Sequence, residues 1–177
     1  MLRILAILAL VVGFAVADRP AFAASADLQN TLYLDTEQGR VTIKLRPDLA
    51  PKHVAQIKAL TKKGFYDGIV FHRVIDGFMA QTGCPQGSGT GGSGKKLKAE
   101  FNAEPHVRGT VSMARASNPD SGDSQFFICF DDARFLDNQY TAWGNVTEGM
   151  EHVDKIKRGE PVSNPDKIVK ATIAADA

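Results

Sequence analysis

The sequence predicts a mainly β protein in which short antiparallel strands form a barrel or a sandwich. Many short strand-like segments follow one another with turn signals between them, and only two segments have a helical pattern. Neither an internal repeat nor an interdomain linker interrupts the 177 residues. These observations together favour one domain of ordinary size.

The first two strands are predicted to form a β-hairpin. Apolar and polar residues alternate over 32–34 and 41–45, on both sides of the turn signal Glu37-Gln38-Gly39. Six later segments also have strand character, and they comprise residues 69–74, 78–82, 110–114, 125–130, 141–146 and 167–173. Residues 83–94 form a single glycine-rich loop, which we expect at the surface.

Two helices are predicted, the first of them between the hairpin and the third strand. Pro51 suits the first helical position, where its missing N–H is not needed, and Gly64 suits the residue just past the end. The buried stripe of this helix is expected to consist of Val54, Ile57 and Leu60. A second, shorter helix is predicted around residues 148–157.

Residues 1–23 have the pattern of a secretory signal peptide. Met1-Leu2-Arg3 is a short positive start, residues 4–16 are apolar, and Ala21-Phe22-Ala23 is a small-x-small cleavage site. The apolar run is shorter than the roughly 20 residues that span a bilayer, which disfavours the alternative of an uncleaved anchor. We therefore expect an exported protein, most simply in a bacterial periplasm, with one mature domain over residues 24–177.

Composition argues against several classes of partner. Without Arg3, Asp18 and Arg19, the 21 basic and 20 acidic residues become 19 and 19, and no long block of one charge remains. A nucleic acid or an anionic membrane surface would need a basic footprint that this chain lacks. Two cysteines do not make a disulfide framework. Cys129 lies in an apolar run and is predicted to be a buried free thiol, whereas Cys84 opens the glycine-rich loop and is predicted to be accessible.

The segment 71–83 carries the residues that indicate function. Strand-like alternation around Arg73, an Asp-Gly turn signal, and then Phe78, Met79 and Gln81 gather a guanidinium, an amide and two large apolar side chains. This combination suits an uncharged, apolar substrate that carries a carbonyl group. A peptide bond fits that description better than a phosphate or a sugar.

Two later segments add residues to this predicted site. Alternation along residues 124–128 places Gln125 and Phe127 on one face and assigns Phe126 to the core. Phe135-Leu136 adds an apolar pair on a loop. The predicted pocket therefore has Phe78, Met79, Phe127 and Leu136 as walls and Arg73, Gln81 and Gln125 as polar groups.

Two long motifs resemble those of a known family. Phe71-His72-Arg73-Val74-Ile75-Asp76-Gly77-Phe78-Met79-Ala80-Gln81-Thr82-Gly83 and Gly122-Asp123-Ser124-Gln125-Phe126-Phe127-Ile128 are similar, in this order, to the two signatures of the cyclophilin-type peptidyl-prolyl cis–trans isomerases. The likeness runs from about residue 32 to residue 173. It implies a closed eight-stranded antiparallel β-barrel capped by two α-helices, a cyclophilin-like single domain.

The resemblance also implies an activity and a set of site residues. The activity is cis–trans isomerisation of X–Pro bonds in proline-containing peptides and unfolded polypeptides, without a metal or other cofactor. The sequence leaves the oligomeric state open, and a monomer is the default expectation. The catalytic residues would be Arg73 and Gln81. The substrate-binding residues would be Phe78, Met79, Ala114, Arg115, Gln125, Phe127, Phe135, Leu136 and Tyr140.

Three positions depart from the commonest eukaryotic pattern of the family. Phe135 stands where many members have Trp, Tyr140 where they have His, and Arg115 where they have Asn. The Trp position is linked in the family to cyclosporin binding, so the departure weakens the expectation of tight inhibition by that drug. Catalysis is less affected, because Phe and Tyr still supply apolar wall.

The residue types suit this reaction because no bond is made or cleaved. A guanidinium at Arg73 can bind the prolyl nitrogen of a twisted amide better than that of a planar amide. Gln81 is suited to hold Arg73 without neutralising it, whereas a carboxylate would pair with Arg73 too tightly. The four histidines are scattered without ligand spacing, so no metal site is expected.

Two alternatives belong to other functional classes. A proline-peptide binding module or holdase would keep the apolar pocket and would not need Arg73. A nucleotide-binding protein could use the glycine pattern Gly87-Ser88-Gly89-Thr90-Gly91-Gly92, but no amphipathic helix follows this pattern. We therefore prefer the isomerase to both.

Overall fold

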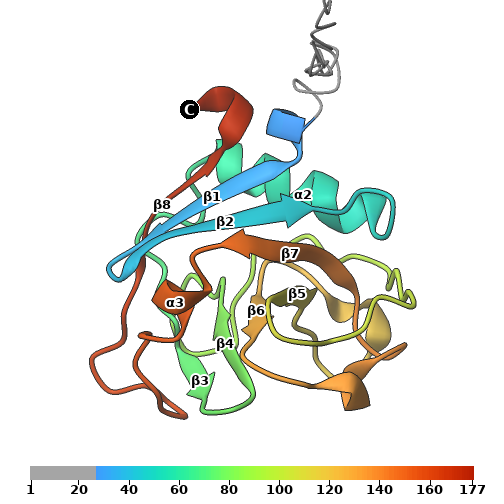
Figure 1. Ribbon diagram of the computed structural model, residues 1–177. Coiled ribbons are helices and arrows are strands. Elements are labelled where there is room, and N and C mark those ends of the chain that lie inside the picture. Colours follow the sequence, from blue (N-terminus) through green and yellow to red (C-terminus); the bar gives the residue numbers. More distant parts are fainter. Residues whose placement is uncertain (1–26) are drawn as a thin grey trace, which may run out of the picture.

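A computed structural model describes residues 27–177 of the chain, and the predicted signal peptide lies outside the described residues. Eight antiparallel strands form one sheet in the order β3-β4-β6-β5-β7-β2-β1-β8 (Figure 1). The strands are β1 (Thr31–Thr36), β2 (Gly39–Leu45), β3 (Arg73–Ile75), β4 (Met79–Thr82), β5 (Thr110–Met113), β6 (Phe126–Cys129), β7 (Ala142–Glu148) and β8 (Ile168–Ile173). The predicted mainly β, eight-stranded antiparallel architecture is thereby confirmed.

The sheet curls into a half-barrel that stays open between its edge strands β3 and β8. No regular ladder joins the two edge regions: isolated bridges lie at Val70↔Lys167 and Val74↔Gly159, and scattered backbone hydrogen bonds, such as that of Phe71 N–H to the Asp166 carbonyl oxygen, connect them. Glycines in left-handed or otherwise unusual conformations interrupt both sides of this gap, including Gly68 and Gly159. Such positions break the regular extended backbone that a continuous ladder needs. The closed barrel that the resemblance implied is therefore not confirmed.

The first helix, α2 (Pro51–Lys62), lies where the sequence predicted it and has its predicted buried stripe. Its N-terminus is capped from a distance, because the Glu100 carboxylate accepts the backbone N–H groups of Lys52 and His53 at 3.0–3.1 Å. Its C-terminus ends as predicted at Gly64, which has φ +67° and whose N–H donates to the carbonyl oxygen of Thr61. This is the Schellman arrangement that glycine favours.

The second helix is much shorter than predicted. The sequence indicated residues 148–157, whereas α3 comprises only Met150–Val153. Strand β7 extends through Glu148 because this residue pairs with Thr42 of β2, and Gly149 then turns the chain with φ +89°. Strand pairing therefore takes the first residues of the predicted helix. The short helices η1 (Pro119–Ser121), η2 (Arg134–Leu136) and η3 (Ala174–Asp176) complete the fold.

The sheet buries apolar side chains on both faces, and β6 shows this most clearly. Phe126 and Ile128 point into the main core, where Phe126 contacts the fully buried Trp143 edge to face at 5.3 Å between ring centroids. Phe127 and Cys129 point to the other face and join a second, smaller cluster with Met79. The predicted opposition of Phe126 and Phe127 is confirmed.

Both cysteines are buried and free. Cys129 is a buried free thiol, as predicted. Cys84 is only 1% exposed, so the prediction of an accessible thiol is wrong. The glycine-rich loop folds back over this side chain, and the N–H groups of Gly89 and Gly91 point at its sulfur.

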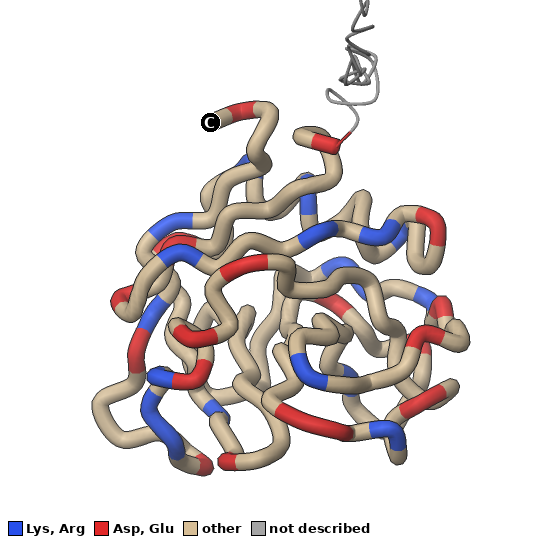
Figure 2. Tube along the Cα trace, viewed as in Figure 1, with Lys and Arg blue, Asp and Glu red and all other residues tan. Residues whose placement is uncertain are grey.

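Charged residues of both signs are interspersed along the described chain (Figure 2). Arginine and aspartate side chains pair locally on this surface, as in Arg40–Asp35 and Arg108–Asp154, both at 2.7 Å. Over residues 27–177, no helix has the length and apolar character needed to cross a bilayer.

Gly83, at the end of β4, provides a test of this architecture. It has φ +85°, and a Cβ there would lie 2.3 Å from the carbonyl oxygen of Ser124. We expect Gly83→Ala to lower the free energy of unfolding by about 2–4 kcal/mol, because backbone strain and a clash add up.

The matched control is Gly77→Ala, since Gly77 also has a positive φ of +65° but would meet nothing within 4 Å. Here only the left-handed strain of about 1 kcal/mol should remain. Urea denaturation of both variants measures the difference. Equal losses would show that the packing of Gly83 against Ser124 does not matter.

Candidate active site

A pocket of about 270 Å³ opens on the face of the sheet that carries the smaller cluster. It lies beside β3, β4 and β6, and the loop that contains η2 closes one side. Its lining consists of Arg73, Phe78, Met79, Gln81, Ala114, Arg115, Phe127, Phe135, Leu136 and Tyr140. The sequence singled out every one of these residues, and the structure brings them together.

The floor of the pocket is apolar and rigidly packed. Met79, Phe127 and Leu136 are at most 8% exposed. Aromatic contacts extend this floor to the rim, where Tyr140 meets Phe127 edge to face at 5.9 Å. At the rim, Phe135 leaves 65% of its surface exposed and packs against Phe78 at 5.3 Å. Such a surface can hold a small apolar ring in a fixed orientation.

A buried polar chain supports the floor from behind. The ring of His106 bonds Asp137 Oδ1 through Nδ1 and Ser112 Oγ through Nε2, both at 2.9 Å, and stacks against Phe127. The Asp137 carboxylate also accepts the backbone N–H of His106, and this bond is the main reason that the pKa of Asp137 is lowered. Ser112 is fully buried within β5, so it cannot meet a substrate as a nucleophile. We interpret this chain as a scaffold for Phe127, and sequence reasoning missed it.

Arg73 provides the positive charge at the edge of the pocket. It lies on β3 directly opposite Gln81 on β4, and its Nη1 lies 3.5 Å from Gln81 Oε1. Its Nε pairs with the carboxylate of Glu160. We expected Gln81 to hold Arg73 without neutralising it, and the structure adds a carboxylate partner that this expectation did not include.

Glu160 is a site residue that sequence reasoning missed. It lies 87 positions after Arg73, in the loop that follows α3, and no local pattern connects the two. The side chains of Arg73 and Glu160 are 36% and 57% exposed, so solvent screens the pair and its contribution to stability is small.

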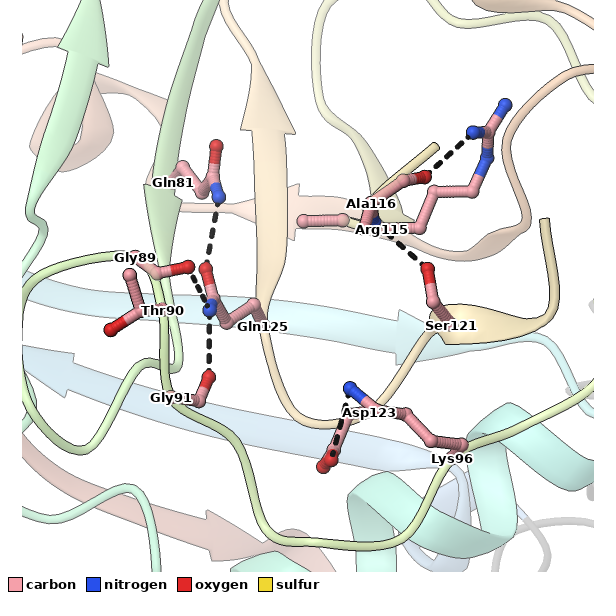
Figure 3. A pocket seen from close by; sticks show the side chains of 11 residues that line it. Gln81, Gly89, Thr90, Gly91, Lys96, Arg115, Ala116, Ser121, Asp123 and Gln125 are labelled. Carbon is pink, nitrogen blue, oxygen red and sulfur yellow. Dashed lines mark hydrogen bonds and ion pairs between the residues drawn. The ribbon is translucent and has the colours of Figure 1, made fainter. Parts of the chain in front are cut away.

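The two glutamines of the predicted site form a directed hydrogen-bond chain (Figure 3). Gln81 Nε2 donates to Gln125 Oε1 at 3.0 Å. Gln125 Nε2 donates in turn to the carbonyl oxygens of Gly89 and Gly91 at 2.8 and 2.7 Å. Gln125 does not line the apolar pocket itself, but it is connected to Arg73 through Gln81.

A second, more polar pocket of about 190 Å³ continues the first and shares Gln81, Ala114 and Arg115 with it (Figure 3). The Arg115 guanidinium lies over the Tyr140 ring at 4.5 Å and donates to the carbonyl oxygen of Gln139, which holds the side chain in place. The remaining lining residues are Gly89, Thr90, Gly91, Lys96, Ala116, Ser121, Asp123 and Gln125. The two pockets together form one groove that is apolar at one end and polar at the other.

Histidine and cysteine chemistry takes no direct part in this groove. His72 faces away from it, as predicted, and packs beneath the glycine-rich loop, where burial lowers its pKa. Among residues 27–177, no three His, Cys, Asp or Glu side chains are grouped in a way that could hold a metal ion.

Comparisons with known proteins agree with one another. Residues 31–174 match the family model described as cyclophilin type peptidyl-prolyl cis-trans isomerase/CLD. A probable peptidyl-prolyl cis-trans isomerase of Brucella suis biovar 1 (strain 1330) is 56% identical over 171 residues, covering 87% of each chain. A peptidyl-prolyl cis-trans isomerase of Helicobacter pylori (strain ATCC 700392 / 26695) is 44% identical over 144 residues, covering 78% of this chain and 88% of its own.

Two solved structures have the same fold. The cyclophilin AquaCyp293 from Hirschia baltica has a TM-score of 0.79 at 32% identity, with 85% of this chain and 76% of that chain covered. A cyclophilin type peptidyl-prolyl cis-trans isomerase of Cryptosporidium parvum, solved in the presence of the dipeptide Ala-Pro, has a TM-score of 0.75 at 28% identity. That alignment covers 81% of this chain and 98% of the other.

The ion pair of Arg73 with Glu160 leads to a prediction. Glu160→Gln keeps a hydrogen-bond acceptor beside Arg73 Nε but removes the opposing charge. We expect kcat/KM for a proline-containing peptide to rise by about two- to threefold, on the hypothesis that Arg73 binds the lone pair of a twisted prolyl nitrogen, because a guanidinium without an opposing charge would bind it more strongly.

The same variant should change the free energy of unfolding by less than about 1 kcal/mol, as for other exposed ion pairs. A protease-coupled isomerisation assay and urea denaturation measure the two quantities. A fall in kcat/KM would show that the Glu160 carboxylate is needed to orient Arg73, and that this effect exceeds the partial neutralisation of the guanidinium charge by the carboxylate.

Proposed function

Because the chain belongs to the cyclophilin-type peptidyl-prolyl cis–trans isomerase family and is an enzyme of that class, we propose that Arg73 drives its catalysis. In this proposal the guanidinium stabilises the twisted X–Pro amide while the apolar pocket holds the proline ring. The observation that carries it is the position of Arg73 at the edge of a pocket whose floor is otherwise apolar.

The barrier that must be lowered comes from amide resonance. Rotation about an X–Pro bond meets a barrier near ~20 kcal/mol and takes tens of seconds or longer without a catalyst. An acceleration to milliseconds requires about four to five decades, or roughly 6 kcal/mol. Since no bond is made or broken, this energy must come from binding the twisted amide more tightly than either planar form.

Arg73 can supply such differential binding. As the amide twists, the prolyl nitrogen regains its lone pair and becomes a hydrogen-bond acceptor. The bonds of Arg73 to Glu160 and Gln81 use Nε and Nη1, and neither of them uses Nη2. Gln81 is neutral, so it orients the guanidinium without removing its charge. A planar amide, whose nitrogen is a poor acceptor, gains much less from the same group.

The apolar floor does the complementary work. Phe78, Met79, Phe127 and Leu136 would hold the pyrrolidine ring while the carbonyl group before it rotates. Met79, Phe127 and Leu136 are at most 8% exposed and belong to the packed cluster under the pocket. The rigid surface that they form would keep the proline ring from turning with the amide. An apolar environment also disfavours the charge-separated resonance form of the amide, which weakens its double-bond character.

We propose that the residues before proline lie along the second pocket, beside Ala114, Arg115 and Gln125. The continuity of the two pockets supports this direction. The Cryptosporidium neighbour that was solved in the presence of Ala-Pro supports proline-containing peptides as ligands of the fold. Unfolded polypeptides with exposed prolines would be the natural substrates, with a monomeric enzyme acting on each bond in turn.

We further propose that residues 1–23 are a cleaved signal peptide and that the mature domain, residues 24–177, acts in the bacterial periplasm. The positive start, the apolar run and the small-x-small site support export. Residues 24–177 contain 19 basic and 19 acidic residues, so the domain has no basic excess to attract a nucleic acid or an anionic membrane. Exported proteins that fold outside the cytoplasm would then be the clients.

Replacement of Arg73 separates an isomerase from a proline-peptide holdase. We expect Arg73→Ala to lower kcat/KM at least about 100-fold, the usual loss when one group that stabilises a transition state is removed. Circular dichroism should be unchanged, and calorimetric binding of a proline peptide should weaken far less than kcat/KM. An unaltered kcat/KM in the protease-coupled assay would remove Arg73 from its proposed role.

Export can be tested on the full chain expressed in a Gram-negative host. We expect the protein in the periplasmic fraction, with Ala24 as its first residue by N-terminal sequencing. Replacing two central leucines of the apolar run, Leu8→Arg and Leu10→Arg, should leave the uncleaved protein in the cytoplasm. A membrane-bound protein that retains Met1 would instead support an uncleaved anchor.

A further inference from the structure

The thiol of Cys84 lies beneath the glycine-rich loop and accepts hydrogen bonds from its backbone. Its sulfur lies 3.2 Å from the nitrogen of Gly89 and 3.3 Å from that of Gly91. Burial alone would raise the pKa of this thiol, but the surrounding backbone N–H groups outweigh burial and lower it. The sulfur is therefore a good acceptor at a fixed point, 1% exposed, at the start of the loop.

The same two glycines are bound on their other side by the active site. Their carbonyl oxygens accept both N–H bonds of the Gln125 side-chain amide, as Figure 3 shows. Gly89 and Gly91 are thus each held twice, by the sulfur through N–H and by Gln125 through C=O. Each glycine therefore connects the sulfur to the side-chain amide of Gln125 through two hydrogen bonds.

The two carbonyl groups also decide which way the glutamines point. A pair of acceptors requires the NH₂ end of Gln125, so its oxygen must face Gln81. Gln81 then donates its own NH₂ to that oxygen and presents Oε1 to Arg73. With Gln125 reversed, Gln81 would turn its NH₂ toward the guanidinium, and two donors would face each other.

Side chains of His72 and Gln86 lie next to the two glycines. Gly89 has φ +84°, and a Cβ at Gly91 would lie 1.2 Å from the side-chain oxygen of Gln86. A Cβ at Gly89 would meet the ring of His72 at 3.4 Å. A side chain would therefore force its neighbour to move only at Gly91, and the sulfur is one of the hydrogen-bond anchors of this loop.

We propose that Cys84 is a positioning residue of the isomerase, which orients Arg73 through the Gly89 and Gly91 peptides, Gln125 and Gln81. This inference rests on the proposed function of Arg73. The longest link is the 3.5 Å contact between Gln81 and Arg73, so the effect of the anchor on the rate is moderate. Cys129, by contrast, lies in the cluster behind the pocket and takes no part in the relay.

The test compares three single variants in the protease-coupled assay. Cys84→Ala removes the sulfur that accepts the N–H bonds of Gly89 and Gly91, and Cys84→Ser replaces it with a hydroxyl oxygen on a shorter bond. Ser88→Ala removes an exposed hydroxyl of the same loop and is the control. We expect Cys84→Ala to lower kcat about five- to tenfold with KM changed less than about twofold, the size of one weakened hydrogen bond. Cys84→Ser should be intermediate, and Ser88→Ala should resemble the wild type.

A double variant distinguishes positioning from a general loss of structure. In the Gln125→Ala background the relay is already cut, so Cys84→Ala should cause no further fall in kcat. An equal fall in both backgrounds would overturn the proposal. A wild-type kcat for Cys84→Ala, or a rise in KM alone, would overturn it as well, since the loop would then be only a wall of the groove.

A spectroscopic measurement keeps the test independent of the role of Arg73. The side-chain NH₂ resonances of Gln81 and Gln125 should shift in Cys84→Ala and stay in place in Ser88→Ala. If Arg73→Ala retains full activity while these resonances shift, the proposed function fails and the positioning by Cys84 stands. Unmoved resonances would overturn the positioning. Should Cys84→Ala not fold, Cys84→Ser carries the same measurements.

Discussion

The structure depends on one constraint, which is that β4 and β6 bury side chains on both of their faces. Alternation along β6 sends Phe126 into the main core and Phe127 into the smaller cluster under the pocket. The floor of the site therefore lies on the opposite face of the same strands that carry the main core, and its side chains are buried like those of a protein interior. A ring that rests on this floor meets a surface that cannot easily yield, which is what the proposed catalysis requires of the proline pocket.

The polar half of the site is organised on a different principle. Its groups are joined in one direction, from the loop carbonyl groups through Gln125 and Gln81 to Arg73. Neutral amides can orient a guanidinium without cancelling its charge, and the Glu160 carboxylate that pairs with Arg73 is exposed to solvent. The site thus combines a rigid apolar floor with a cation that keeps most of its electrostatic effect on an amide nitrogen.

Local rules accounted for most of the fold, and local rules together with the family resemblance accounted for the lining of the pocket. Period-two alternation predicted the hairpin and the opposite faces of Phe126 and Phe127, and Pro51 and Gly64 predicted both ends of α2. The same rules failed where pairing with a distant strand competes with a local preference. Residues 148–157 have a helical pattern, yet β7 holds Glu148 in the sheet through Thr42. The open edge between β3 and β8 depends likewise on two segments that are far apart in the chain.

By itself, the sequence determined the antiparallel class, the first helix and the main walls and polar groups of the apolar pocket, because these follow from spacing and residue type along the chain. The remaining lining residues, among them Arg115 and Tyr140, were implied by the family resemblance. Only the tertiary structure decided the partner of Arg73, the burial of Cys84 and the scaffold formed by Asp137, His106 and Ser112. The reason is physical: ion pairs, thiol contacts and buried hydrogen bonds join side chains across folded space, and a linear pattern carries no record of which distant residue will supply the other half.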